Sequence, residues 1–404
     1  MKQQSSSRLT SDWLGRLRRG ASAQAVKRGV RSFEDRLASL RRRLRPGWRP
    51  PVLFEVFTPF GFEAQEPVIH ALQARGRVSV TLAGGAERGV APDRLHRLAS
   101  AGVQLVPLAA VRHRRYEAVV VTDRRQVISW RSPRVAFLHH GSSFANLESP
   151  YAFQLYEEGE YDFLLALHPT ERELAVATFG PGMANRVRVV GQPKLDRLAD
   201  GAIDVEGVRQ ALGLLPGRKT VLVTSHWTPT SLLCTCGEAV LEHLRACRDL
   251  NVIVTGHHHL WGFPSRWART VDWQARLAWV GQEHHMRLLP RVADLHALMA
   301  VADVMVSDHS SATAECAILG RPLVVYRDPA HRFHGDRFDG LLSETAEVFH
   351  GADDFSRALG RALHQPAPAP GPRHRFLSAA FAFLGSSTGQ AAEAVENLAL
   401  TGRL

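Results

Sequence analysis

Three predicted strand ends in this chain of 404 residues carry histidine or hydroxyl side chains. In parallel α/β sheets, ligands bind beyond the carboxyl ends of the strands, so these positions are candidates for chemistry. The three places are His140-Gly141 after residues 134–138, His257 after 251–255, and the turn 308–311 after 304–306. An imidazole whose ordinary pKa is about 6.5 suits a general base, and hydroxyl groups suit an anion. The combination predicts a site that binds a negatively charged group and moves a proton.

Residues 304–326 have the pattern strand, polar turn, helix and strand. Asp308, Ser310 and Ser311 are residue types that favour a helix N-terminus, where backbone amide groups are left without partners. Such a helix start at a strand end predicts an anion site. An ordinary βαβ unit with a well-capped helix is the alternative. Glu315, one helical turn further on, is placed to reach a ribose hydroxyl, or else to remain a solvated helix residue.

Histidine is frequent in this sequence, with twenty residues, so a capping or packing role is the alternative for any one of them. His257, His258 and His259 are consecutive and invite a metal interpretation. Neighbours on an extended chain point in different directions, and no carboxylate follows at helical spacing. We therefore predict no metal site and no cofactor, and expect a single histidine here to face an anionic leaving group.

Apolar runs alternate with helical stretches along most of the chain. The predicted strands are 52–57, 78–82, 103–106, 118–121 and 134–138, followed by 220–224, 251–255, 287–289, 304–306 and 323–326. This alternation predicts an α/β protein with two Rossmann-like, doubly wound domains that face a cleft. Neither a Gly-x-Gly-x-x-Gly fingerprint nor a Walker loop is present, so the dinucleotide and ATPase interpretations lack their motifs.

Breaks in composition divide the chain into four predicted parts. Residues 1–50 form a basic segment, 51–200 the first domain, 201–365 the second domain, and 366–404 a proline-rich link with a terminal helix. A linker is expected near 191–217. These boundaries place the candidate residues in both domains, around the predicted cleft.

The net charge of +11 lies entirely in the first fifty residues, which hold fourteen Lys and Arg against three acidic residues. Apolar residues recur there at roughly helical spacing, so we expect a helical extension that lies on an anionic membrane surface. A disordered tail or a helix packed on the body are the alternatives, and a nucleic-acid arm is the minor one. The remaining chain is formally neutral, which predicts no nucleic-acid partner.

Composition is otherwise that of a globular protein, with 45% hydrophobic and 22% charged residues. No apolar run approaches the length of a membrane span. Four cysteines are too few for a disulfide framework and fit a reducing compartment. We expect a cytoplasmic protein, with the basic segment at the inner face of the plasma membrane.

Ordered motifs between residues 135 and 330 resemble the CDP-glycerol glycerophosphotransferases of teichoic-acid-type polymer synthesis, a GT-B-like family. That family has a strand followed by His-Gly, then Gly-x-Pro-(Arg/Lys)-x-Asp, a Pro-Thr-Trp-like turn, a strand ending in Lys-x-His-Pro, and Ser/Thr-Asp-Tyr-Ser-Ser. The matching stretches are His140-Gly141, residues 191–198, Ser225-His226-Trp227-Thr228-Pro229, Thr255-Gly256-His257-His258, Asp294-Leu295-His296, and Ser307-Asp308-His309-Ser310-Ser311.

Two departures from this pattern stand out. The Lys-x-His-Pro position lacks its lysine and its proline, and the Pro-Thr-Trp turn is rearranged. Glu315, followed by Gly320-Arg321-Pro322, instead resembles an element of nucleotide-sugar GT-B glycosyltransferases and UDP-sugar 2-epimerases, in which the glutamate holds a ribose. An epimerase is disfavoured because residues 57–61 lack that family's Gly-Thr-Arg-Pro loop.

The resemblance implies roles for the matching residues. His140 would deprotonate an acceptor hydroxyl, and His257 would contact the transferred phosphate or the leaving group. The implied donor-binding residues are Gly141, His226, Asp308, Ser310, Ser311 and Glu315. The implied activity is transfer of a glycerol- or ribitol-phosphate from a CDP-linked donor to a cell-surface polymer or lipid-linked acceptor. A nucleotide-sugar glycosyltransferase and a non-catalytic scaffold protein are the alternatives.

Overall fold

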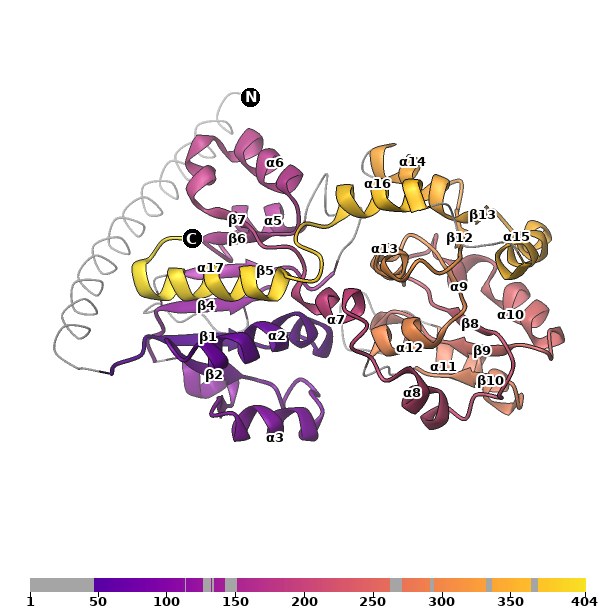
Figure 1. Cartoon of the computed structure of the whole chain (residues 1–404), viewed down its shortest axis with the longest axis horizontal. Coiled ribbons are helices and arrows are strands. Elements are labelled where there is room, and N and C mark those ends of the chain that lie inside the picture. The colour runs from indigo at the N-terminus through magenta and orange to yellow at the C-terminus, as the bar shows by residue number, and fades with distance from the viewer. Residues whose placement is uncertain are drawn as a thin grey trace, which may run out of the picture.

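The computed structural model describes residues 47–112, 114–125, 132, 134–141, 151–261, 271–290, 294–331, 336–364 and 370–404. These residues form two α/β lobes that lie side by side (Figure 1). Each lobe is built on one sheet in which every strand pair is parallel. The predicted pair of doubly wound sheets is confirmed.

The first lobe contains a sheet of seven strands in the order β3-β2-β1-β4-β5-β6-β7. Its elements are β1 (Pro51–Glu55), α2 (Pro59–Arg75), β2 (Ser79–Ala83), α3 (Pro92–Ser100), β3 (Gln104–Val106), α4 (Leu108–Val111), β4 (Ala118–Val121), β5 (Val135–Leu138), α5 (Tyr151–Glu157), β6 (Phe163–Ala166), α6 (Pro169–Phe179), the 3₁₀ helix η2 (Pro181–Asn185) and β7 (Val187–Val189). The central strands are continuous apolar runs because helices cover both faces of the sheet. One face packs on α2 and the other on α5 and α6.

The second lobe contains six strands in the order β10-β9-β8-β11-β12-β13. Its elements are β8 (Thr220–Val223), α9 (Leu232–Thr235), α10 (Gly237–Ala246), β9 (Asn251–Val254), η4 (His258–Trp261), α11 (Trp273–Arg276), η5 (Ala278–Gln282), β10 (Met286–Leu288), α12 (Leu295–Val301), β11 (Val304–Ser307), α13 (Ser311–Cys316), η6 (Ala317–Leu319), β12 (Leu323–Tyr326), α14 (Asp336–Thr345), β13 (Glu347–Phe349) and α15 (Ala352–His364). This sheet also has a separate apolar core on each face.

Three strands were not predicted from the sequence, namely β6, β7 and β13. The strands β7 and β13 have only three residues each, too few to show a period of two. The sequence of β6, Phe-Leu-Leu-Ala, contains no β-branched residue, so its composition does not distinguish a strand from a helix. The remaining strands lie within about two residues of their predicted ends.

The segment 191–217, where the sequence predicts a linker, contains three short helices. It contains η3 (Pro193–Leu195), α7 (Asp196–Ala199) and α8 (Val205–Ala211). Gly191 has a φ of 75°, and a Cβ there would collide with the carbonyl oxygen of Ala382 and the side chain of Ser387. Only glycine therefore allows the two segments that join the lobes to approach each other at this point.

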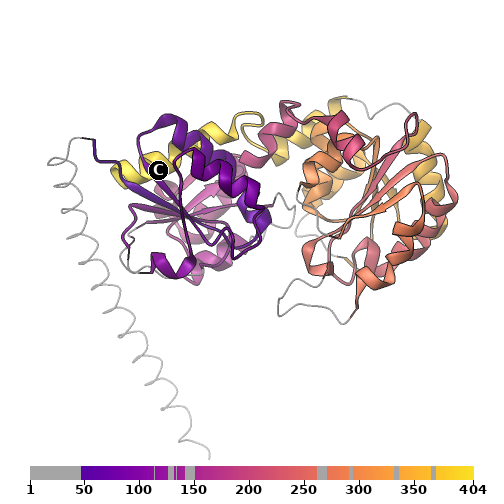
Figure 2. The same cartoon turned by 90° about the horizontal axis from the view of Figure 1, so that it is seen from below.

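The predicted terminal helix is in fact two helices that belong to different lobes. Helix α16 (Pro370–Ala380) packs on the second lobe through Phe376, and α17 (Ser387–Thr401) returns to the first lobe (Figure 1). There α17 packs against α2 and contributes alanines, Val395 and Leu398 to the core. The chain thus passes between the lobes twice, along one side of the molecule (Figure 2).

The start of α17 is held by a side chain that is distant in sequence. The Asp196 carboxylate accepts hydrogen bonds from the amides of Ser387 at 3.1 Å and Thr388 at 2.7 Å. A carboxylate at this place binds the unpaired amides and the positive end of the helix dipole. The aspartate of the Gly-x-Pro-Lys-x-Asp motif is therefore structural in this chain.

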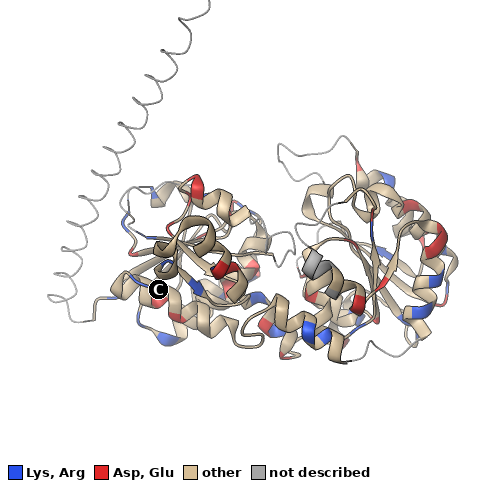
Figure 3. Cartoon of the chain, turned by 90° about the horizontal axis from the view of Figure 1, so that it is seen from above, with Lys and Arg blue, Asp and Glu red and all other residues tan. Residues whose placement is uncertain are grey.

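Acidic and basic residues are interspersed over both lobes (Figure 3). Residues 1–46 of the predicted basic extension, which spans 1–50, lie outside the described part of the chain. Among the described residues, no helix combines the length and the apolar character needed to cross a bilayer.

Candidate functional site

A cavity of about 550 Å³ lies between the lobes, at the carboxyl ends of strands from both sheets. Seven of the eight residues proposed from the sequence line it, namely His140, Gly141, His226, His257, Ser310, Ser311 and Glu315. The eighth, Asp308, is buried and does not line the cavity. Residues that the topology places in separate sheets are thus brought to one site.

His140 follows β5 and has a defined tautomer. Its Nδ1 lies 2.7 Å from the carbonyl oxygen of Thr122, which can only accept a hydrogen bond. Nδ1 therefore carries the proton, and Nε2 of the neutral ring has a lone pair. Burial lowers the pKa of His140, although the nearby carboxylate of Asp123 acts in the opposite direction. At neutral pH this imidazole is a base.

His139 points to the other side of the strand and is structural. Its Nε2 lies 2.6 Å from the carboxylate of Glu171, its ring packs edge-on against Phe137, and both His139 and Glu171 are buried. Side chains of consecutive residues in extended chain point to opposite sides, so of the two histidines that follow β5, His140 is the one that faces the cavity.

His257 and His226, in the second lobe, have the opposite tautomer. The Nδ1 of His257 accepts a hydrogen bond from the amide of His259 at 3.3 Å, and that of His226 accepts one from the amide of Thr228 at 3.4 Å. Each neutral ring therefore carries its proton on Nε2 and can donate it. Burial lowers the pKa of His257 well below its ordinary value, and lowers that of His226 to about 4.

The histidines 257–259, called here the triple-histidine cluster, do not diverge as the sequence argument assumed. The chain leaves the extended conformation at His258 and enters the 3₁₀ helix η4, so the three rings gather with centroids 4.1 to 4.9 Å apart. All three line the cavity, and Phe60 of the first lobe stacks on His258 at 5.0 Å. The expectation that only one of them faces the cavity is wrong.

Asp308 holds the turn after β11 in place. Its side chain is fully buried, and its two oxygens accept four sets of hydrogen bonds. The donors are the Ser225 hydroxyl at 2.8 Å and the amides of His226 at 3.0 and 3.1 Å, Leu232 at 2.9 Å and Ser310 at 3.0 Å. These donors occupy the Asp308 carboxylate in the described structure, and its expected contact with a donor molecule stays a prediction.

Ser310 and Ser311 present their side chains at the start of α13. The Ser310 hydroxyl caps the helix by accepting a hydrogen bond from the amide of Ala312. Gly141 of the first lobe faces Ser311, since a Cβ on Gly141 would lie 3.7 Å from the Ser311 hydroxyl. The loop that carries His140 in the first lobe is therefore adjacent to the turn that carries Ser310 and Ser311 in the second lobe.

Glu315 forms an ion pair across the lobes. Its carboxylate lies 2.9 Å from the Lys194 ammonium of the first lobe and 2.9 Å from Nε2 of His296. Burial alone would raise the pKa of Glu315, but the charge of Lys194 and the hydrogen bond from His296 outweigh it and lower the pKa to about 2. The Glu315 carboxylate also lines the cavity, and its expected contact with a ribose hydroxyl stays a prediction. Both lie in the stretches that resembled the family, at Gly-x-Pro-Lys and Asp-Leu-His.

Replacing Lys194 with Met should destabilise the protein by about 3–5 kcal/mol, because Glu315 would keep its buried charge without the ammonium. In the native chain, the stability from this depressed pKa is complete above about pH 4.5 and is lost as the pH falls towards 2. The double variant Lys194→Met/Glu315→Gln should recover most of the loss. Urea unfolding of the four proteins gives the coupling energy, and additive losses would contradict a direct pair.

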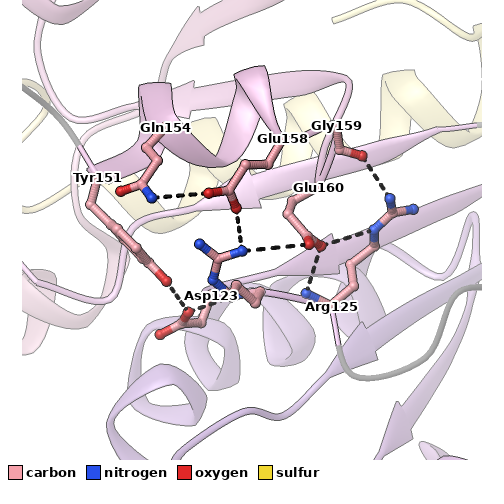
Figure 4. A network of polar contacts seen from close by, with 8 residues as sticks. Asp123, Arg125, Tyr151, Gln154, Glu158, Gly159 and Glu160 are labelled. Carbon is pink, nitrogen blue, oxygen red and sulfur yellow. Dashed lines mark hydrogen bonds and ion pairs between the residues drawn. The ribbon is translucent and has the colours of Figure 1, made fainter. Parts of the chain in front are cut away.

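The first-lobe wall of the cavity is fixed by a polar network after β4 (Figure 4). The Tyr151 hydroxyl donates a hydrogen bond to Asp123 at 2.7 Å, and Arg124 forms an ion pair with Glu158. Residues 123, 124, 151 and 154 line the cavity, and no motif in the sequence marked them.

Glu63, near the start of α2, is a further residue that no motif marked. It lines the same cavity. Burial raises the pKa of Glu63 to about 7, against the opposing charge of Lys194. This places a group that can exchange a proton near neutral pH in the first lobe.

Residues 119–341, more than half of the chain, match the family described as CDP-glycerol:poly(glycerophosphate) glycerophosphotransferase. The chain belongs to this family. It is a glycerophosphotransferase-type enzyme that transfers a polyol phosphate from a CDP-linked donor to a polymer. This function is favoured over the nucleotide-sugar glycosyltransferase and the scaffold.

Solved structures show the same fold. The wall teichoic acid polymerase TagF is 14% identical, with a TM-score of 0.55 and coverage of 96% of this chain and 97% of that chain. A putative UDP-N-acetylglucosamine 2-epimerase from Listeria monocytogenes is 13% identical, with a TM-score of 0.57 and coverage of 87% and 96%. The GT-B-like fold class is thereby confirmed. No curated protein sequence matches the chain described here.

Proposed function

We propose that the cavity between the lobes is the active site, and that it transfers glycerol phosphate from CDP-glycerol to a hydroxyl of a growing polymer. The first lobe, residues 51–200, binds the acceptor, and the second lobe, residues 201–365, binds the donor. The acceptor oxygen forms a bond to the phosphorus that carries the glycerol. The bond from that phosphorus to the oxygen bridging it to CMP breaks, and CMP leaves with the electron pair.

The observation that carries this proposal is the opposite tautomer of the histidines on the two sides of the cavity. His140 has a lone pair on Nε2 and takes the proton of the acceptor hydroxyl. His257 and His226 have protons on Nε2 and donate hydrogen bonds to phosphate oxygens. Phosphoryl transfer needs this arrangement of positioned donors around the phosphate more than it needs a nucleophile of the protein.

Ser310 and Ser311 complete the donor side. Their hydroxyls lie in the cavity wall opposite Gly141, where the diphosphate would meet the acceptor. Asp308 fixes both the Ser310 amide and the His226 amide, so a single buried carboxylate aligns two parts of the donor site. Lys194 and Glu315 hold the lobes in register beside it.

Release of CMP should be fastest with CDP-glycerol and a glycerol-phosphate oligomer as substrates, and should depend on both. UDP-N-acetylglucosamine and GDP-mannose serve as control donors. The Ser311→Ala variant, which removes one positioned donor, should lower kcat about 100-fold. Release of UDP or GDP at a higher rate than CMP would contradict the proposal, and so would CMP release that is independent of the acceptor.

We also propose that the basic segment, residues 1–50, holds the enzyme on an anionic membrane surface at the cytoplasmic face, where a lipid-linked acceptor would be presented. Its net charge of +11 supports this, at about 1 kcal/mol per basic residue near the lipid. The full chain should cosediment with vesicles that contain phosphatidylglycerol and be released by salt. Equal binding to neutral phosphatidylcholine vesicles would contradict it.

A further inference from the structure

The triple-histidine cluster has the geometry of a metal site. One ligand nitrogen from each of His257, His258 and His259 lies within 4.8 Å of the other two. Zinc–nitrogen bonds of about 2.0–2.1 Å place tetrahedral ligands roughly 3.4 Å apart, so small side-chain rotations would bring the three nitrogens to one ion. Three imidazoles leave a fourth position open, and the cluster lines the cavity.

The charge balance of the cavity provides a second, independent observation. Two of the described lining residues are Lys or Arg, namely Arg124 and Lys194. Arg124 is paired with Glu158, and Lys194 with Glu315, so the positive charge of the described wall is already neutralised. A nucleoside diphosphate brings a cluster of negative charge that phosphoryl-transfer sites normally compensate with metal ions, Lys or Arg.

One position of the family pattern that carries a positive charge is changed in this sequence. At the position of the Lys-x-His-Pro pattern, the lysine is replaced by Thr255 and the proline by His258. The Thr255 hydroxyl is used by the fold, since it donates to the carbonyl oxygen of Leu289 at 2.8 Å. Compared with the family pattern, the end of β9 thus lacks a cationic side chain and has additional imidazoles beside His257.

We propose that the triple-histidine cluster binds one divalent cation of the zinc class, and that this cation faces the donor diphosphate in place of the absent lysine. The catalytic part of this inference rests on the proposed function, whereas the binding part does not. With three neutral ligands the ion keeps its double positive charge, and its open position takes a water molecule or a phosphate oxygen. With the ion bound, His257 is a ligand, and the contact with a phosphate oxygen that the proposed function assigns to it passes to the ion.

A second group in the described chain provides a matched control. Glu283, His284 and His285 also place one ligand atom each within 4.8 Å of the others. This group is outside the cavity, and two of its side chains have other partners. Glu283 bonds to Arg245 at 2.7 Å, and Nε2 of His285 lies 3.4 Å from the carbonyl oxygen of Leu244.

Titration of the metal-free full chain with Co²⁺ and Zn²⁺, followed by calorimetry and visible absorption, tests the site. We expect one tight equivalent in the native chain and in His284→Gln/His285→Gln, and binding at least tenfold weaker in His258→Gln/His259→Gln. Equal binding by the native chain and the His258→Gln/His259→Gln variant would overturn the proposal. So would loss of the tight equivalent in the control variant.

The role of the bound cation in catalysis is tested by CMP release from CDP-glycerol in the presence of a chelator. We expect a rate at least tenfold lower, restored by Zn²⁺ in the native chain but not in His258→Gln/His259→Gln. Tight binding with an unchanged rate in chelator would overturn the charge-supplying role and leave the proposed function intact. Tight binding without CMP release under any condition would instead overturn the proposed function.

Discussion

The variant His140→Gln should lose roughly 100- to 10,000-fold in kcat for CMP release, because glutamine has no lone pair basic enough to take the acceptor proton. This is the largest effect on activity that we expect from a single substitution. Glutamine retains a polar group beside the Thr122 carbonyl, so folding should be preserved. Turnover at saturating CDP-glycerol and acceptor gives the measurement. His70→Gln, an exposed change on α2 in the same lobe, is the control and should leave kcat unchanged.

The pH dependence of the native enzyme provides a second readout of His140. Burial lowers its pKa below the ordinary value of 6.5, so the base is already deprotonated at neutral pH. Because activity requires the unprotonated ring, kcat/KM should rise with pH through this pKa and be level on its base side near neutrality. An acid limb centred above pH 7, or one that persists in His140→Gln, would assign the base to another group.

The variant Asp308→Asn should lose about 3–5 kcal/mol in the free energy of unfolding, a loss as large as that expected for Lys194→Met. An amide presents N–H groups where the carboxylate accepts hydrogen bonds, so buried donors would lose their acceptor. The affected donors belong to Ser225, His226, Leu232 and Ser310. Since two of these residues line the proposed donor site, CMP release should fall as well.

Chemical denaturation of Asp308→Asn beside Ser225→Ala separates the carboxylate from a single hydrogen bond. The Ser225→Ala change removes one donor and should cost about 1 kcal/mol. Similar midpoints for the native chain and Asp308→Asn would show that the turn after β11 does not depend on this charge. A stability loss without any change in CMP release would show that the donor side tolerates movement of the turn.

The sheets and the placement of seven site residues could be predicted because both depend on local patterns. A short apolar run followed by a polar turn specifies a strand and its carboxyl end, and parallel sheets place such ends at one edge. His140 and Ser310 were accessible by this reasoning alone.

The pairs that cross between the lobes could not be predicted in the same way. Lys194 and Glu315 are brought together by the relative placement of two domains, and no period in either segment encodes it. Glu63 was missed because its significance arises from burial in the assembled cavity, which raises its pKa. The gathering of the three rings of histidines 257–259 was not predicted, because an extended backbone was expected where the chain begins a 3₁₀ helix.

The return of α17 to the first lobe has a consequence for biosynthesis. One face of the first sheet packs against Val395 and Leu398, and the Glu396 carboxylate bonds to Arg75 at 2.8 Å. The ribosome delivers these residues after the whole second lobe. The first lobe therefore cannot complete its core until the second lobe and α17 have been synthesised, and stays partly folded in the meantime. Domains that fold as units usually do so in order of synthesis, and this topology reverses that order.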